Sequence, residues 1–205
     1  MALDRRSLRR SPGLSFAKTL GCGKGETFTP SDLDISRWGF IFTIDESHLE
    51  YFDNSKVVMR WRERAQSEFR VLLDPLSSRG SWSGVNPFTF RNQIDTANSE
   101  VVAITRARIS WRQSLTFWRA VPPVTHSLRL HPGLLAAFGI GEAPIGLQGT
   151  FSHWISASAL REFAYQGDAH KEVIAATQRS HWYTEELFAR FSVREVRGSL
   201  GADSS

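Results

Sequence analysis

The most distinctive chemical group in this sequence is a histidine near the start of an expected helix. His170 lies in the run Asp-Ala-His-Lys-Glu-Val-Ile at 168–174, where Asp168 is suited to cap a helix. Helical spacing places Val173 and Ile174 on the face that carries His170, so the imidazole is expected to point toward an apolar interior. Such an imidazole can bind a metal ion, or it can be a core histidine satisfied by a backbone carbonyl. The residue pattern alone leaves both open.

The remaining histidines and the single cysteine are weaker candidates for metal ligands. His126 and His131 stand beside prolines and are expected in loops near a pocket mouth, as a second ligand, a substrate contact or loop structure. A lone cysteine in a glycine-rich loop is usually inert. This weaker group comprises His48, His126, His131, His153, His181 and Cys22.

Charged residues suggest one further contact with a ligand. Arg106 and Arg108 share one face of an expected strand at 101–109, where an arginine could bind an anionic ligand group or bound oxygen, or simply face solvent. Glu185 and Glu186 are neighbours on an expected strand, so they point to opposite faces and do not form an acid–base pair. The glycines at 139–146 lack the lysine and the helix of a phosphate-binding loop, and no spacing typical of zinc occurs.

The elements that must position these residues occur in two related halves. Pro-Gly-Leu at 12–14 returns at 132–134, and a glycine-rich loop is expected after each copy. The arginine-glycine-serine run at 79–81 returns at 197–199. The two repeated motifs occur in the same order and with similar spacing, which indicates a duplication. The first half lacks a counterpart of the strand at 101–109 and of the helix expected after Ser110, so we expect it to be truncated at its front. Residues 91–99 are polar and form the expected linker.

Hydrophobic periodicity predicts the order of strands and helices in each half. In the first half we expect a strand, two helices and a closing strand; in the second, a strand and helix precede that same pattern. Ser156 is suited to cap the helix after the second-half strand. The expected strands are 37–44, 68–73, 101–109, 147–154 and 186–196, and the expected helices are 45–52, 56–67, 110–121, 156–165 and 168–179.

Composition limits the class of protein. The chain has 205 residues, of which 41% are hydrophobic and 12% aromatic, so it can bury a substantial core around a large apolar ligand. One cysteine and no apolar leader favour a cytoplasmic protein. No apolar run is long enough to span a membrane, so we expect at most peripheral membrane contact. A net charge of +4 is too scattered to indicate nucleic-acid binding.

Three longer blocks resemble one family. They are Phe-Trp-Arg-Ala-Val-Pro-Pro-Val-Thr-His at 117–126, the glycine-rich run at 139–152, and Trp-Tyr-Thr-Glu-Glu-Leu-Phe-Ala-Arg-Phe at 182–191. These blocks resemble the spheroidene monooxygenases, the acyclic carotenoid 2-ketolases. The resemblance implies an α+β fold of two ferredoxin-like halves packed as a dimeric α/β barrel. The expected boundaries are 1–90 for the first repeat, 91–99 for the linker and 100–205 for the second repeat, which carries the site.

The resemblance also implies a cofactor and a set of site residues. It favours His170 as the axial ligand of a haem b iron, with Val173 and Ile174 lining the pocket. Trp154, on the preceding strand, is the counterpart of a tryptophan that lies over the haem in related haem-degrading enzymes. Arg106 would bind a haem propionate or polarise bound oxygen. The corresponding helix of the first half has no histidine, which predicts one haem per chain.

The expected activity is therefore a haem-dependent monooxygenation of an apolar substrate such as a linear carotenoid. It would require dioxygen and a separate ferredoxin-type electron donor. Two alternatives remain at this stage: a haem enzyme with different chemistry, such as dehydration or oxidation at nitrogen, and a non-catalytic carrier of haem or an apolar ligand. An unpaired edge strand in the truncated half would favour a homo-oligomer.

Overall fold

A single seven-stranded antiparallel sheet organises the molecule, which is a mixed α+β protein. The computed structural model describes residues 5–8, 10–89, 99–109, 125–142, 149–166 and 183–200. His170, Val173 and Ile174 lie outside these residues, as does the helix expected at 110–121. The strands are β1 (Leu14–Gly23), β2 (Leu33–Ile44), β3 (Phe69–Gly80), β4 (Val101–Ile109), β5 (Leu134–Gly141), β6 (Gly149–Trp154) and β7 (Tyr183–Gly198). The helices are α1 (Arg5–Leu8), η2 (Pro30–Asp32), η3 (Glu46–His48), α2 (Leu49–Asp53), α3 (Lys56–Arg64), a short helix at 125–130 and α5 (Ala157–Gln166).

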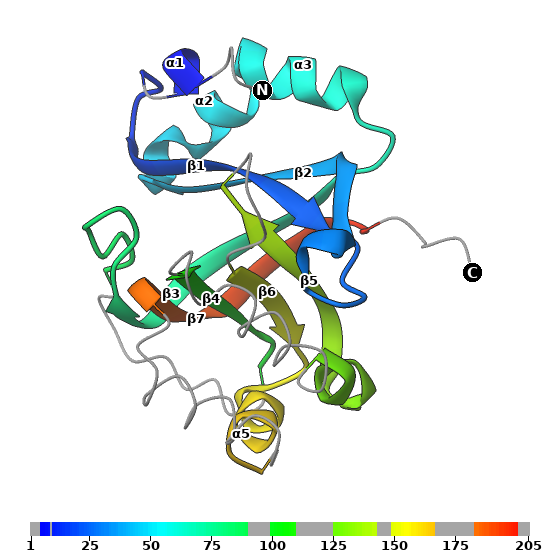
Figure 1. Cartoon of the computed structure of the whole chain (residues 1–205). Coiled ribbons are helices and arrows are strands. Elements are labelled where there is room, and N and C mark those ends of the chain that lie inside the picture. Colours follow the sequence, from blue (N-terminus) through cyan, green and yellow to red (C-terminus); the bar gives the residue numbers. More distant parts are fainter. Residues whose placement is uncertain are drawn as a thin grey trace.

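The sheet is curled, and its strand order is β2-β1-β5-β6-β4-β7-β3 (Figure 1). Its concave inner face encloses the largest hydrophobic core, to which all seven strands contribute. Alternation along each strand explains this, because every second side chain points inward. On β4, for example, Val102 and Ile104 face the inner core, whereas Val101 packs on the outer face.

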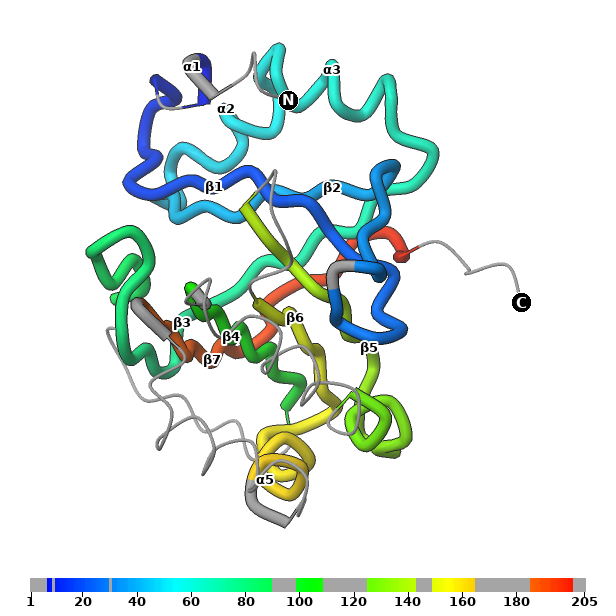
Figure 2. Tube along the Cα trace, viewed as in Figure 1, coloured from blue at the N-terminus to red at the C-terminus, as the bar shows by residue number. Residues whose placement is uncertain are grey.

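Helices cover the outer face at two opposite ends (Figure 1). At one end α2 and α3 bury Phe52, Val57 and Val58 against β1 and β2. At the other end α5 and the 125–130 helix pack on β5 and β6 around Trp154. The trace in Figure 2 shows the same division of the helices.

Several sequence expectations match these elements. The strand predicted at 101–109 is β4, with both ends as expected, and α5 begins where Ser156 accepts a hydrogen bond from the Ala159 N–H at 3.1 Å. The helix predicted at 56–67 ends earlier, at Arg64. The closing strand predicted at 68–73 continues to Gly80 through Pro75, a residue that a strand tolerates at a sheet edge because it lacks an N–H donor.

Two predictions were wrong about the glycine-containing segments. Residues 14–23 and 134–141 are strands β1 and β5, where the sequence analysis expected loops after each Pro-Gly-Leu run. They pair with each other at Gly21 and Gly141, and β3 pairs with β7 along its length. The two parts of the chain therefore join edge to edge in one sheet, and they do not form two separate facing sheets.

The backbone repeats itself between these two parts. The β1–β2 and β5–β6 pairs have the same register, including a bulge at the same point: Leu14 opposes Ile44 as Leu134 opposes Trp154. The N–H of Asp45 donates to the Gly13 carbonyl, as the N–H of Ile155 donates to the Gly133 carbonyl, each at 3.0 Å. β3 and β7 end in the same way, with Gly80 and Gly198 at positive φ. The strand β4 lies between β6 and β7, whereas no described strand lies between β2 and β3.

Candidate active site

Arg106 and Trp154, which the sequence analysis placed at one site, lie on opposite faces of the sheet. Arg106 points into the inner face beside Trp82, whereas Trp154 packs in the outer cluster under α5. They also lie at opposite ends of the β4–β6 pair, since Val101 opposes Trp154 and Arg106 opposes Gly149. The expectation that both residues line one pocket is not met, because alternation assigns them to different faces.

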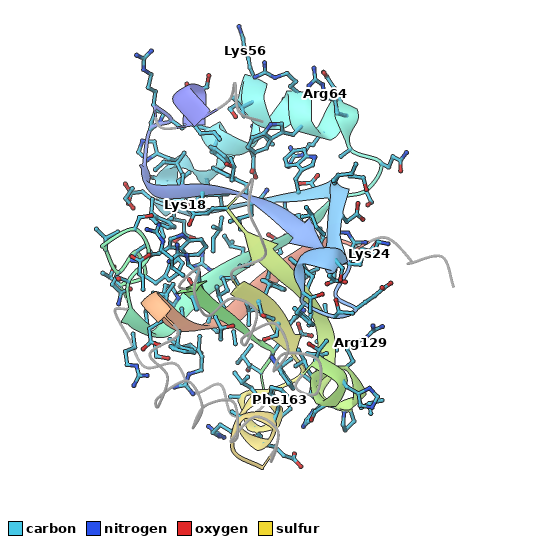
Figure 3. The ribbon with its side chains drawn as sticks, viewed as in Figure 1. Lys18, Lys24, Lys56, Arg64, Arg129 and Phe163 are labelled. Carbon is cyan, nitrogen blue, oxygen red and sulfur yellow. The ribbon has the colours of Figure 1, made fainter. Side chains whose placement is uncertain are left out.

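Arg106 belongs to a buried network of charges that connects five parts of the sheet. Its guanidinium donates to Glu185 at 2.5 Å and to Glu142 at 3.1 Å, and its side chain is only 3% exposed. Glu142 also accepts from Trp82 Nε1 at 2.6 Å and from Lys18 Nζ at 3.0 Å. Lys18 belongs to β1 and is labelled in Figure 3. Two cations and two carboxylates balance, so the cluster is electrically neutral.

Hydrogen bonds hold both carboxylates of this network in the charged form. Burial acts to raise the pKa of Glu185, but the donated bonds from the Gly84 N–H and Arg106 outweigh it and lower the pKa to about 2. Burial likewise opposes, without overcoming, the donors Trp82 and Lys18 that lower the pKa of Glu142. With its carboxylates charged, the network is a set of matched ion pairs.

This arrangement gives Arg106 a structural role at one end of the inner core. Its two terminal nitrogens already bind Glu185 and Glu142, and its guanidinium lies 5.2 Å from the Trp82 ring. The network thus stabilises the junction of β1, β4, β5, β7 and the 81–84 turn, and it engages both terminal nitrogens of Arg106.

Trp154 is the centre of an aromatic cluster on the outer face. Its side chain is fully buried between His131, whose ring centroid is 5.2 Å away, and Phe163 of α5, at 5.3 Å. The indole Nε1 has no hydrogen-bond partner among the described residues. A buried donor without an acceptor is costly and uncommon. Within the described part of the chain, this buried N–H is therefore a donor that still requires an acceptor.

Gly133 sets the geometry around this cluster. A Cβ at position 133 would lie 2.4 Å from the Ala159 Cβ and 3.3 Å from ring atoms of His131, so only glycine allows α5 to pack this closely. The Gly133 N–H donates to Nδ1 of His131 at 3.1 Å. Because Nδ1 accepts, the proton of a neutral ring is on Nε2, and His131 offers no free nitrogen lone pair to a metal in this arrangement.

An open cavity of about 420 Å³ lies beside the cluster. It is formed between the 26–27 loop and the 125–130 helix, whose Leu128 packs into the Trp154 cluster. His126, expected near a pocket mouth, lies on its wall, and the exposed Arg129 lines the same cavity. Arg129 and Phe163 are labelled in Figure 3. The cavity residues are Glu26, Thr27, Thr125, His126, Arg129 and Leu130.

Two further candidate ligands, His153 and Cys22, lie among the described residues and are buried. His153 is buried on the face opposite Trp154, and its Nε2 pairs with Glu100 at 2.8 Å. Burial raises the pKa of the Cys22 thiol to about 11, so the free thiol is protonated at neutral pH. Within the described part of the chain, no group of three metal-binding side chains occurs. His170 and His181 lie outside that part.

Sequence reasoning did not identify the partners of Arg106. Trp82 and Glu142 are 60 residues apart and meet only because the ends of β3 and β5 converge. Glu185 was recognised only as a strand residue. The one available signal was its position on β7, the strand that pairs with β4 and places Glu185 opposite Arg108.

Comparison with known proteins places this chain in a family. It is 36% identical over 207 residues to the spheroidene monooxygenase of Rhodobacter capsulatus, covering 99% of this chain and 86% of that protein. The chain belongs to the spheroidene monooxygenase family. Two further family members are the spheroidene monooxygenases of Cereibacter sphaeroides, 30% identical over 98% of this chain and 61% of that protein, and of Rubrivivax gelatinosus, 33% identical over 91% and 72%.

Solved structures outside the spheroidene monooxygenase family are more distant. A candidate monooxygenase from Fusobacterium nucleatum aligns with a TM-score of 0.47 at 9% identity, covering 95% of this chain and 82% of that chain. One from Lactobacillus acidophilus aligns with a TM-score of 0.43 at 10% identity, covering 96% and 83%. No protein-family profile matches the sequence. None of the described helices is long and apolar enough to cross a membrane.

Proposed function

We propose that this protein is a haem-dependent monooxygenase that hydroxylates or ketolates an apolar polyene such as a linear carotenoid. The observation that carries this proposal is the 36% identity to a spheroidene monooxygenase over 99% of the chain. Dioxygen is the oxidant, and a separate ferredoxin-type donor supplies the electrons.

The outer cluster is aromatic and carries one buried donor, and these two features support a flat, largely apolar cofactor such as haem b beside it. Trp154 and Phe163 supply ring faces, and the Trp154 N–H is a buried donor without an acceptor among the described residues. The proposed iron ligand is His170, with Val173 and Ile174 beside it, as the family resemblance implies. Haem, when bound, supplies the oxygen activation.

The described residues contribute binding, orientation and exclusion of water. Trp154 is fully buried beneath α5 and Leu128, and such burial keeps water away from its surroundings. The Trp154 N–H would orient an acceptor atom of the bound cofactor or substrate. At the other end of the sheet, the Arg106 network fixes the positions of β4, β5 and β7, so that the site rests on rigid strands.

The strand order supports a finer proposal about the fold. In the second half the order β5-β6-β4-β7 is that of a ferredoxin-like unit, and β1, β2 and β3 repeat three of its strands. We propose two such halves joined as an α/β barrel, with no counterpart of β4 among the described residues of the first half. A cytoplasmic location and a homo-oligomeric state remain predictions.

Two measurements test the proposed function. Purified protein should show a haem Soret band, and the pyridine haemochrome assay should give about one haem per chain. His170→Ala should remove the haem, whereas His126→Ala, in the cavity wall, serves as the matched control and should retain it. Retention of haem by His170→Ala together with its loss from His126→Ala would overturn the ligand assignment.

Turnover then separates an enzyme from a carrier. Incubation with a linear carotene, a ferredoxin reducing system and ¹⁸O₂ should give a labelled product. Unlabelled product would indicate a different haem reaction, such as dehydration. Tight haem binding without turnover of any apolar substrate would indicate a carrier.

A further inference from the structure

Two short segments contribute both to the open cavity and to the outer aromatic cluster. The loop between β1 and β2 presents Glu26 to the cavity and buries Phe28 in the cluster. The helix at 125–130 likewise presents Arg129 to the cavity and buries Leu128 in the cluster. The polar cavity and the apolar cluster therefore adjoin at these two segments.

Hydrogen bonds hold the two segments in place. Thr125 Oγ1 donates to the carbonyl of Thr27 at 3.1 Å and so ties the helix to the loop. Within the loop, the buried carboxylate of Asp32 accepts from the N–H groups of Glu26 at 3.0 Å and Phe28 at 3.3 Å. The φ of Phe28 is 54°, a conformation that is costly for a bulky residue and persists only where its surroundings enforce it. The walls of the cavity are therefore fixed by specific contacts.

Arg129 is the only arginine or lysine among the described residues that line the cavity. Its side chain is exposed, and within the described part of the chain its guanidinium has no ion pair or hydrogen bond. Arg106 differs, because both of its terminal nitrogens bind carboxylates. A guanidinium can bind a carboxylate group through two parallel N–H···O bonds. Glu26, on the loop side of the cavity, is the one acidic lining residue described and would oppose such binding.

We propose that Arg129 binds an ionised propionate of haem at this cavity. The inference rests on the proposed function and adds to it the residue that binds the charged edge of the cofactor. Haem is apolar over its ring and carries two carboxylates on one edge. It requires an apolar pocket with a polar, open side, because burial of an unpaired charge is costly. The aromatic cluster and the cavity supply these two environments next to each other.

This assignment replaces the role that the sequence suggested for Arg106. Arg106 lies on the inner face of the sheet beside Trp82, whereas Trp154 lies in the outer cluster. Arg129 follows directly after Leu128, which packs in that same cluster. A cation beside the outer cluster is therefore better placed than Arg106 for a ligand held there.

The test compares haem b with its dimethyl ester, in which both propionates are neutral. Each porphyrin is titrated into the full chain freed of haem, and binding is followed by the Soret band. The ratio of the two affinities measures the preference of each variant for free propionates. Arg129→Ala should reduce this preference about fivefold, as expected for one partly exposed ion pair. Arg64→Ala is the matched control, since Arg64 is an exposed arginine on α3, away from Arg129 in Figure 3.

Glu26→Gln gives a second test with the opposite sign. Removal of this carboxylate should raise the preference for haem b about twofold, because it removes a like charge near the propionate. A purely structural role of Arg129 does not predict this increase. Melting temperatures of the haem-free variants should match the wild type, because all three replaced side chains are exposed.

The outcomes separate this site from the proposed function. An unchanged preference in Arg129→Ala, with haem still bound, would overturn the assignment of Arg129 alone. Equal binding of both porphyrins by the wild type, together with binding of free succinate that requires Arg129, would assign the cavity to a small carboxylate and would also overturn it. Binding of neither porphyrin by the wild type would remove the proposed haem function, and this site with it.

Discussion

Arg106 Nη1 donates to Glu185 Oε2 at 2.5 Å, and both side chains are largely buried. This contact joins β4 to the first residues of β7. In the sequence, β7 follows the segment that carries His170. Glu142 is a second partner of Arg106, so the pair belongs to a network and its loss has structural consequences away from the contact.

Glu185→Gln should lower the free energy of unfolding by about 2 to 4 kcal/mol, because it leaves a buried guanidinium with one charged partner. Urea denaturation measures this. Glu195→Gln is the control, since Glu195 pairs with Arg197 at the surface and should cost less than about 1 kcal/mol. Equal effects of the two substitutions would contradict the buried role of Glu185.

Stability should fall in acid through the same carboxylate. Its folded pKa of about 2 lies below the ordinary value of 4.5, so the folded state binds fewer protons than the unfolded state between these values. The contribution of Glu185 is present above pH 4.5 and is lost as the pH falls toward 2. Melting temperatures recorded across this range should drop more steeply for the wild type than for Glu185→Gln. Parallel curves of melting temperature against pH for the two proteins would contradict the lowered pKa of Glu185.

Two buried tryptophans should respond differently to replacement by phenylalanine. Trp82 and Trp154 are both almost completely buried, but only Trp82 Nε1 has a described partner, Glu142. Trp82→Phe should destabilise the ligand-free protein by about 1 to 3 kcal/mol more than Trp154→Phe. The reason is that Trp82→Phe removes an existing hydrogen bond to Glu142, whereas Trp154→Phe removes an N–H without a described partner. Chemical denaturation of the two variants side by side gives the comparison. A larger cost at Trp154 would show that its N–H has a partner.

Gly133→Ala should destabilise the α5 end by about 1 to 3 kcal/mol, since the new methyl group would overlap the Ala159 Cβ. Ala159→Gly in the same chain should recover part of this loss, although glycine within a helix costs about 1 kcal/mol of its own. The four stabilities of this cycle give the coupling between the two positions. Absence of coupling would mean that α5 does not pack against Gly133.

Cys22 should not react with a thiol reagent such as DTNB at pH 8 while the protein is folded. Its side chain is 4% exposed, and with a pKa of about 11 only about one thiol in a thousand is ionised at that pH. Full reaction is expected after addition of denaturant. Rapid labelling of the native protein would show that β1 opens in this region.

Local patterns in the sequence were sufficient for several elements. Strict alternation at 101–109 predicted β4 with its ends, and Ser156 predicted the start of α5 because a capping hydroxyl acts on the adjacent backbone. β1 and β5 were missed because glycines at 21, 23, 139 and 141 imitate a loop, and their pairing stabilises a strand that propensity alone disfavours. Neighbouring strands, which the local sequence does not describe, decided these two segments.

By itself the sequence determined the family resemblance, the internal repeat, and the residue types available for a site. Only the tertiary structure decided which of these residues meet. Register against β6 placed Trp154 opposite Val101 and so on the outer face, while Arg106 turned inward to Glu142 and Glu185. Pairing register depends on contacts between strands far apart in the chain, and a shift of one residue exchanges the two faces of a strand. For that reason the separation of Arg106 from Trp154 followed from the packed sheet and not from either local segment.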